Sequence, residues 1–307
     1  MKTINYLTVL SFIALLACSP AMSQEASTDS TGLPGDNFSL QGALEMFKKA
    51  SSPEEFEKLI NTEDNSVNNL DMNDDGETDY VRVIDKMDKD LHAFVLQVPV
   101  SETESQDIAV IEIEKTGDTT AVLQIIGDED IYGEEIIVEP DGGGEEEAFI
   151  EYNYNNNQRG PNADFYTPSP RIILNVWMWP SVRFVYAPIY RPWISPWRWR
   201  HFPAWWHPWR PLGWQVWHPR HILFYRHFAV VHTHRVVRAH AFYRPVRVNS
   251  ITVRNRHATA VGNYRVTRSR TTVTGPRGNG MIRKTTTVQG PRGNVRASKT
   301  TVKRRHR

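Results

Sequence analysis

Residues 91–115, LHAFVLQVPVSETESQDIAVIEIEK, hold two apolar runs joined by a short polar turn. Both runs are rich in Val, Ile and Leu and alternate in part with polar residues, which is the pattern of β-strands. Similar runs begin at Tyr80 (YVRVID), Thr120 (TAVLQIIGD) and Glu134 (EEIIVEP). Because the connecting turns are too short for a crossover, neighbouring strands must be antiparallel. The pattern therefore predicts a meandering antiparallel sheet.

Two short amphipathic helices are predicted on the N-terminal side of this sheet. Apolar residues recur at helical spacing from Leu40 to Phe47. Residues 52–55, SPEE, form a capping box with proline at the first helical position, and an apolar face follows it. Residues 38–140 are accordingly expected to be an acidic α+β domain, preceded by a flexible lead at 24–37.

Charge is divided sharply along the chain, although the formal net charge of all 307 residues is only +1. All 35 Asp and Glu residues lie at or before Asp164, together with only nine of the 36 Lys and Arg residues, so this part carries −26. Residues 165–307 carry +27 and contain no carboxylate side chain. Such segregation predicts electrostatic association, either between the two halves or with an external anionic partner.

Beyond residue 140 the composition predicts three further segments. Residues 141–170 are rich in Gly, Asn and Pro and are expected to be a linker. Residues 171–248 form a cationic module rich in Trp, Arg, His and Pro, whose prolines exclude long helices and favour an irregular, β-poor chain. Residues 249–307 form a basic tail with a Thr-rich repeat, TTVTGPRGN from Thr271 and TTVQGPRGN from Thr286. The repeat fits short strands or a disordered arm, and we expect disorder because large apolar residues are scarce.

The N-terminus has the composition of an export signal. A lysine precedes an apolar run at 7–17 that is too short to span a membrane, and small residues follow it. Cleavage by signal peptidase would remove residues 1–23. LLAC, ending at Cys18, instead resembles the lipobox of bacterial lipoproteins, which implies a signal of residues 1–17 and lipidation of Cys18. Both outcomes predict an exported protein of the bacterial cell envelope, in the periplasm or lipid-anchored to a membrane.

Residues 71–79, DMNDDGETD, carry the sharpest motif. Side-chain oxygens at relative positions 1, 3, 5 and 9, a backbone carbonyl at position 7 and glycine at position 6 suit a hard cation held in a tight loop. The stretch resembles the DxDxDGxxD calcium loop of integrin-type propeller repeats. The resemblance implies a structural Ca²⁺ ion bound by Asp71, Asn73, Asp75, Glu77 through its carbonyl, and Asp79. The alternative is an Asx-rich turn closed by its own hydrogen bonds.

All ten tryptophans lie between Trp177 and Trp217, and the densest stretch is PWRWRHFPAWWHPWRP at 196–211. Its composition resembles that of indolicidin-type Trp/Pro-rich cationic peptides, which implies a habit of binding membrane interfaces. Tryptophan prefers the lipid headgroup region, and arginine pairs with phosphate. The residues predicted to bind an anionic surface are Trp193, Trp197, Arg198, Trp199, Arg200, Trp205, Trp206, Trp209 and Arg210. The alternative is that the tryptophans pack together, or onto the acidic domain, as a core.

The histidines of the basic half raise the question of a transition-metal site. His232 and His234 would share one face of a strand, and His227 and His240 lie near them in sequence. Imidazoles bind zinc or copper. Because no carboxylate or thiolate is close in sequence and arginines are interleaved, we expect a cationic, surface-facing strand instead. The acidic clusters on either side of Tyr132 are expected to be solvated turns.

The overall plan resembles that of uncharacterised exported proteins of Gram-negative bacteria, a resemblance that implies location only. The leading hypothesis is a non-enzymatic envelope protein in which a calcium-steadied acidic domain carries a cationic aromatic region that binds lipid headgroups or lipopolysaccharide. The alternative is a structural, self-associating protein whose acidic and basic halves bind each other. An enzyme is not expected, because no catalytic groups converge in the sequence, and export argues against nucleic acid as the partner.

Overall fold

The computed structural model describes residues 30–141, 148–151, 171–263, 265–274, 280–289 and 295–305. The predicted export signal with Cys18, most of the predicted linker and the two GPRGN segments of the tail repeat lie outside the described residues.

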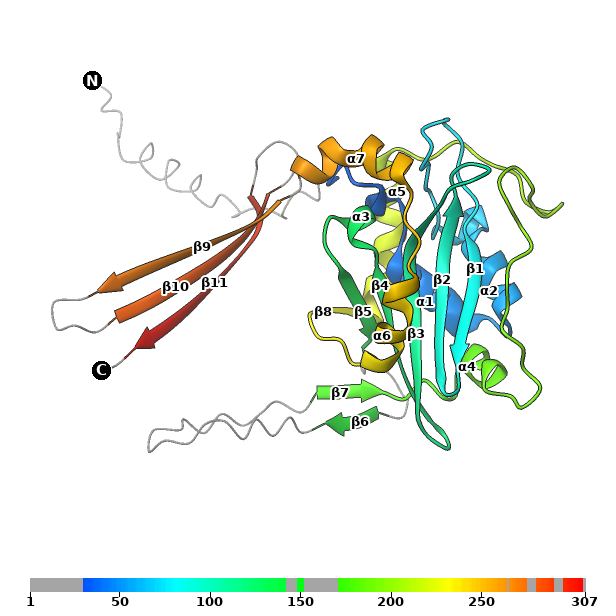
Figure 1. Ribbon diagram of the computed structural model, residues 1–307, viewed down its shortest axis with the longest axis horizontal. Coiled ribbons are helices and arrows are strands. Elements are labelled where there is room, and N and C mark those ends of the chain that lie inside the picture. Colours follow the sequence, from blue (N-terminus) through cyan, green and yellow to red (C-terminus); the bar gives the residue numbers. More distant parts are fainter. Residues whose placement is uncertain are drawn as a thin grey trace, which may run out of the picture. The chain divides into compact units, whose positions relative to one another are not determined.

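The central element is a six-stranded sheet in which every neighbouring pair is antiparallel (Figure 1). In spatial order its strands are β1 (Arg82–Asp88), β2 (Leu91–Pro99), β3 (Ser105–Gly117), β4 (Thr120–Gly127), β5 (Ile136–Pro140) and β8 (Phe228–Val231). The register places Phe94 opposite Ile111, and Ile113 opposite Leu123. The predicted α+β class and the meander of the first five strands are confirmed.

Two short helices precede the sheet, as predicted. α1 (Leu40–Lys49) begins after Ser39, whose hydroxyl accepts a first-turn N–H at 3.0 Å. α2 (Pro53–Ile60) begins after Ser52, whose hydroxyl accepts the Glu55 N–H at 3.2 Å. These caps satisfy N–H groups that the first turn of a helix leaves without a partner, so the predicted helix starts are confirmed.

One face of the sheet packs on these helices. Alternate strand positions and the helices together form the largest apolar cluster, which includes Phe47, Phe56, Phe94 and Ile111. The Phe47 ring meets the Phe56 ring edge-on at a centroid distance of 5.1 Å. Two valines of α4 (Pro180–Val185), from the basic half, belong to the same cluster. Both halves of the chain therefore build one core.

The opposite face of the sheet is covered by the basic half. α6 (Val237–Tyr243) lies over β2 and β3 (Figure 1). Tyr243 packs there against an apolar cluster that includes Val95 and Val110. The polar strand residues on this face are buried as well: Gln97, Glu112, Glu114 and Gln124. The sheet is thus the middle layer of three, and its polar alternation marks a second buried face.

β8 joins the basic half to the sheet itself. It pairs with β5, placing Val230 opposite Val138 and Phe228 opposite Pro140. Contacts between α-carbons group Thr31–Arg307 in one unit. The boundary predicted at residue 140 between an acidic domain and a cationic module therefore does not separate two folding units. The physical reason is that β5 would otherwise be an unpaired edge.

The remaining elements are short helices and two small sheets. The helices are η1 (Pro34–Asn37), η2 (Glu63–Asn65), α3 (Glu129–Tyr132), α5 (Trp214–His221), η3 (Ile222–Arg226), η4 (Arg244–Val246) and α7 (Ile251–Asn263). β6 (Ala148–Glu151) pairs with β7 (Arg171–Leu174). In the tail, where we expected disorder, the structure has the strands of the alternative prediction: β9 (Arg265–Thr274), β10 (Gly280–Gln289) and β11 (Val295–Arg305). The Thr-rich repeats pair in antiparallel register, with Thr285 opposite Thr300.

Candidate functional site

The aromatic cationic segment, residues 193–210, lies along the edge of β1. The Asp85 N–H donates to the Trp193 carbonyl at 2.7 Å, and the Ser195 N–H donates to the Val83 carbonyl at 3.1 Å. The residues between them form an antiparallel bridge. The segment therefore covers a sheet edge that would otherwise present unpaired N–H and C=O groups.

A buried carboxylate, Glu57 of α2, holds this segment in place. It accepts hydrogen bonds from the Tyr80 hydroxyl at 2.9 Å and from the Val83 N–H at 2.8 Å. From the aromatic segment it accepts the Ser195 hydroxyl at 3.0 Å and the Trp193 indole N–H at 3.3 Å. Burial raises the pKa of Glu57, although these donors favour the ionised form. Glu57 thus connects α2, β1 and the aromatic cationic segment.

The tryptophans of the segment differ in exposure. Trp206 is only 4% exposed, and its ring centroid lies 5.1 Å from that of Tyr80 and 4.5 Å from that of Phe202. Trp205 is 44% exposed and lies 5.7 Å from the Lys58 ammonium. The others are partly buried: Trp193, Trp197, Trp199 and Trp209. Trp206 therefore belongs to the core, while the other five keep exposed surface.

The arginines of this segment are exposed and lie away from carboxylates. Arg198, Arg200 and Arg210 form no ion pair with any residue that the structure describes. The Arg200 guanidinium lies instead over the Trp199 ring, 5.4 Å from its centroid. Four other arginines of the basic half are likewise exposed and without an ion pair to described residues: Arg183, Arg191, Arg220 and Arg226. At these positions the described structure leaves positive charge without an acidic partner.

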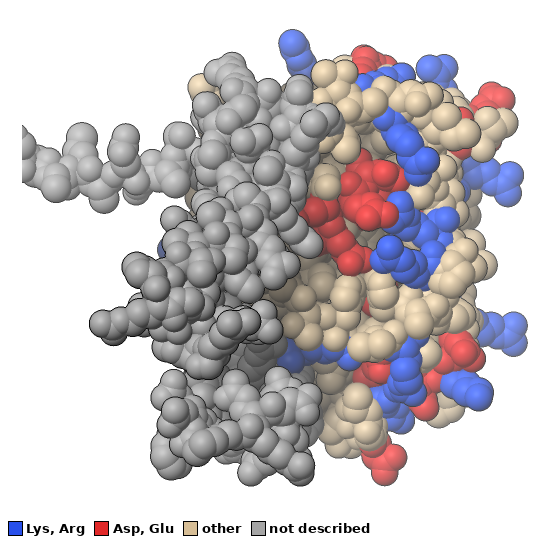
Figure 2. Space-filling model, turned by 60° about the vertical axis from the view of Figure 1, so that its left-hand side comes forward, with Lys and Arg blue, Asp and Glu red and all other residues tan. Residues whose placement is uncertain are grey.

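Arginines further along the chain are neutralised by carboxylates of the sheet region. Arg235 pairs with Glu139 at 2.7 Å. Arg247 lies 3.1 Å from Asp128, which is buried. Figure 2 shows basic and acidic side chains next to one another on one face of the protein. The prediction that the acidic cluster before Tyr132 is a solvated turn is therefore wrong at Asp128, because the basic half covers it.

The predicted calcium loop, residues 71–79, is a tight turn closed by its own acidic side chains. The Asp71 carboxylate accepts the N–H groups of Asp75 and Gly76 at 3.1 and 2.9 Å, and Asp75 accepts the Glu77 N–H at 3.0 Å. Gly76 has φ +83°, in the left-handed region that favours glycine. These are the hydrogen bonds of the Asx-turn alternative, and each carboxylate keeps further lone pairs for a cation.

Asp79 closes the loop from the protein side. Its buried carboxylate accepts the Met72 N–H at 2.6 Å, and burial, with smaller contributions from Asp71 and Asp75, raises its pKa to about 7. Burial also raises the pKa of Asp71. A cation would relieve this repulsion, so the residue types fit a hard ion. Asp71, Asp75 and Asp79 do not bring three ligand atoms within 4.8 Å of one another in the described structure, so binding Ca²⁺ requires the loop to tighten.

Calcium is expected to stabilise the folded protein through this loop. At a free concentration of 100 times Kd, an ion that binds only the folded state adds about 2.7 kcal/mol. Asp75→Asn should remove most of this gain, whereas Asp118→Asn, on an exposed hairpin turn, should leave it intact. Thermal unfolding with Ca²⁺ and with a chelator measures the effect, and identical unfolding temperatures would contradict the calcium assignment.

The increase in the free energy of unfolding that Ca²⁺ produces is expected to be larger at higher pH. Asp71 and Asp79 have raised pKa values, and both must be ionised to bind the ion. Without the ion the sign is opposite: the stability linked to protonated Asp79 is present below about pH 4 and is lost as pH rises through about 7. Scans at about pH 5 and about pH 8, with and without Ca²⁺, separate the two effects.

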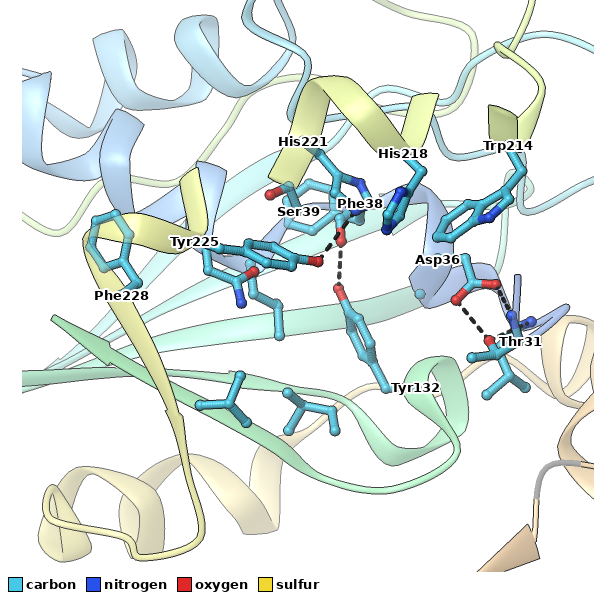
Figure 3. Close-up of a pocket in the computed structure, with 16 residues that line it drawn as sticks. Thr31, Asp36, Phe38, Ser39, Tyr132, Trp214, His218, His221, Tyr225 and Phe228 are labelled. Atoms are coloured by element: carbon cyan, nitrogen blue, oxygen red, sulfur yellow. Dashed lines mark hydrogen bonds between the residues drawn. The ribbon is translucent and has the colours of Figure 1, made fainter. Parts of the chain in front are cut away.

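A cavity of about 450 Å³ lies between the N-terminal segment, the ends of β5 and β8, and α5 (Figure 3). Trp214, His218 and His221 line it from α5, and Phe38 and Tyr132 line it from the acidic half. The spacing of the three α5 residues places them on one helix face, a helical periodicity that is visible in the sequence. The residues of the opposite wall, such as Phe38 and Tyr132, are distant in the sequence, and no sequence pattern indicates that they face α5.

The polar groups of this cavity are mostly engaged. Thr31 donates its N–H and its hydroxyl to the Asp36 carboxylate. Burial lowers the pKa of His221 to about 4, so its imidazole is neutral. His221 Nδ1 has no hydrogen-bond partner, and Nε2 lies 3.3 Å from the Tyr225 hydroxyl. The cavity can therefore receive an uncharged, largely apolar group that offers one hydrogen bond.

Comparison of the chain with protein-family models, with curated proteins and with solved structures gave no match. Within the described ranges, no helix combines the length and the apolar character needed to cross a bilayer. A function for this protein has to be inferred from its own residues.

Proposed function

We propose that this protein is a non-enzymatic, exported component of the bacterial cell envelope that binds an anionic surface through its aromatic cationic segment. One observation carries the proposal: Arg198, Arg200 and Arg210 are exposed, without a carboxylate partner among the described residues, beside partly exposed tryptophans. The export signal favours phosphate-bearing envelope surfaces, either lipid headgroups or lipopolysaccharide, over nucleic acid.

The chemistry of the segment suits a phosphate-rich interface. A guanidinium donates two parallel hydrogen bonds to a phosphate, and an indole ring is favoured at the level of lipid headgroups. Trp199 provides such a ring beneath Arg200, and Trp205 provides an exposed ring in the same segment. Trp206 is buried and is left out of the proposed binding surface.

In this proposal the calcium loop supports the aromatic cationic segment. The Thr78 N–H donates to the Trp209 carbonyl at 2.7 Å, so the loop is hydrogen-bonded to the aromatic cationic segment. Tyr80, directly after the loop, contacts both Trp205 and Trp206. Ca²⁺ bound at residues 71–79 would therefore stiffen the platform from which the arginines project.

An enzymatic role forms no part of the proposal. The His92 ring contacts the Asp85 carboxylate at 2.9 Å, a pairing that general bases use. Both residues are buried, however, and the rings of Tyr186 and Tyr190 pack on His92. The pair lies inside the core, where no substrate can reach it.

Replacing Arg198, Arg200 and Arg210 together by Gln is expected to weaken binding to anionic vesicles at least tenfold. Each arginine near an anionic surface contributes about 1 kcal/mol, and about 1.4 kcal/mol corresponds to a factor of ten. Co-sedimentation with phosphatidylglycerol vesicles and with isolated lipopolysaccharide, at low and high salt, measures the loss and distinguishes the two sources of phosphate.

A matched control removes the same charge elsewhere: Lys49→Gln, Lys89→Gln and Arg254→Gln, all at exposed positions. Equal binding by this control and by the triple arginine variant would show that only net charge matters and would overturn the proposal. Point substitutions are required, because deleting residues 165–307 would also remove β8 and part of the core.

A second candidate function, structural self-association, is favoured by the ion pairs between the halves. Arg235–Glu139 and Arg247–Asp128 join basic and acidic residues far apart in sequence. Between chains, the same contacts would form by exchange of the basic half. Light scattering tests this: salt-dependent dimers or larger assemblies would support it, and a monomer at all salt concentrations would exclude it.

A further inference from the structure

Three side chains from separate parts of the chain converge on one side of the sheet. Glu135, His234 and His240 each place a ligand atom within 4.8 Å of the others, and they form the one such group found in the described ranges. His234 Nε2 lies 3.0 Å from one Glu135 oxygen, and His240 Nε2 lies 3.8 Å from the other. The two imidazole rings are 4.2 Å apart between centroids.

The fold explains why these residues meet. Glu135 directly precedes β5, and His234 follows β8 by three residues, so the antiparallel pairing of these two strands brings them together. His240 lies on α6, which packs over β3. The carboxylate that was missing from the local sequence is thus supplied by the acidic half of the chain.

A fourth residue fixes the orientation of His240. Glu112 of β3 is 0% exposed, and one of its carboxylate oxygens lies 3.0 Å from His240 Nδ1. When Glu112 is ionised its carboxylate can only accept, so in that state Nδ1 carries the proton and Nε2 is left facing Glu135. A histidine that binds a metal through one nitrogen commonly donates its other N–H to a carboxylate in this way.

We propose that Glu135, His234 and His240 bind a divalent transition-metal ion such as Zn²⁺ or Cu²⁺, with Glu112 as a positioning residue. The two imidazoles are borderline ligands that suit these ions better than Ca²⁺ or Mg²⁺, and Zn²⁺ also accepts a carboxylate oxygen beside them. The three side chains are 31%, 28% and 18% exposed, which gives an ion access and leaves a coordination position for water.

Three arginines lie close in sequence to the two histidines, but they do not prevent metal binding. Two of them are neutralised by carboxylates that are not metal ligands. Arg235 pairs with Glu139 at 2.7 Å, and Arg238 pairs with Glu114 at 3.0 Å. Arg244 is the exception, since its Nη1 lies 3.5 Å from both the Glu135 carboxylate and His240 Nε2. Its guanidinium stands where a metal ion would stand, and its side chain is 56% exposed, so it can move into solvent when the ion binds.

The test is titration of the full chain with ZnCl₂ and, separately, CuCl₂, with affinity measured by competition against a chromophoric chelator. His234→Ala is expected to weaken binding of the tightest ion at least tenfold. Glu112→Gln, which changes no ligand, is expected to weaken it about tenfold, in the range typical of residues that orient a metal-bound histidine. Arg244→Gln should bind several times more tightly than the wild type, because the competing cation is gone.

His232→Ala is the matched control, since His232 is exposed and lies two residues from His234 outside the cluster. It should bind as the wild type does. Circular dichroism checks that each variant is folded. If a ligand variant is unfolded, the metal affinity of the folded Arg244→Gln protein, compared with that of the wild type, tests the proposal. Equal affinity of the wild-type, His234→Ala and Arg244→Gln proteins would overturn the proposal, and so would equal losses in His232→Ala and His234→Ala. Either outcome leaves the vesicle experiment unaffected.

Discussion

Glu57→Ala is expected to lower the free energy of unfolding by about 4 kcal/mol or more, because each buried donor left without an acceptor costs about 1–3 kcal/mol. Four donors lose their acceptor at once, from the side chains of Tyr80, Ser195 and Trp193 and from the backbone of β1. Urea unfolding followed by circular dichroism measures the loss.

The control for this variant lies on the same helix. Glu54 is exposed in the first turn of α2, and Glu54→Ala should change stability by no more than about 0.5 kcal/mol. Glu57→Gln keeps an acceptor oxygen and should fall between the two. A Glu57→Ala protein as stable as the Glu54→Ala protein would mean that Glu57 does not hold the aromatic cationic segment to the sheet.

The second large effect separates two adjacent tryptophans. Trp206→Ala removes a 4% exposed ring that contacts Tyr80, Phe202 and Trp209, and it should cost about 3–5 kcal/mol. Trp205→Ala removes a 44% exposed ring and should cost about 1 kcal/mol or less. Chemical unfolding of the two variants measures this difference.

The order should reverse for binding to anionic vesicles. Trp205→Ala should weaken binding severalfold, since an exposed indole contributes at the interface. Folded Trp206→Ala protein, measured well below its unfolding temperature, should bind nearly as the wild type does. If Trp206→Ala is folded and loses binding while Trp205→Ala keeps it, the division of the segment into a buried and a binding part is wrong.

Much of the first face of the sheet could be predicted from sequence, whereas little of the second face could. Ile111 and Ile113 alternate with Glu112 and Glu114, and such a pattern with short turns is sufficient for an antiparallel meander. Alternation does not say what covers the polar face. Glu112 and Gln124 have the pattern of solvent-facing residues, yet both are 0% exposed because residues beyond 230 pack over them.

Long-range pairing explains the other differences. The segregation of charge pointed to association between halves, but it could not pair Arg235 with Glu139 or bring Glu135 beside His234. Within the run of tryptophans, neighbours such as Trp205 and Trp206 have identical local signals. Trp206 packs against Tyr80, which is distant in the sequence, and against Phe202 of the same segment, and neither contact can be read from the local sequence.

The position of β8 has a consequence for the way this protein reaches its folded state. β5 ends at Pro140, and its partner strand begins only at Phe228, about 90 residues later, so closure of the sheet is a late event. During synthesis from the N-terminus, the first half emerges with an unpaired strand edge and a face of carboxylates that lack their arginines. We expect slow folding that finishes only when residues beyond 230 are available, which would keep the chain unfolded for transport across a membrane if it is exported as proposed.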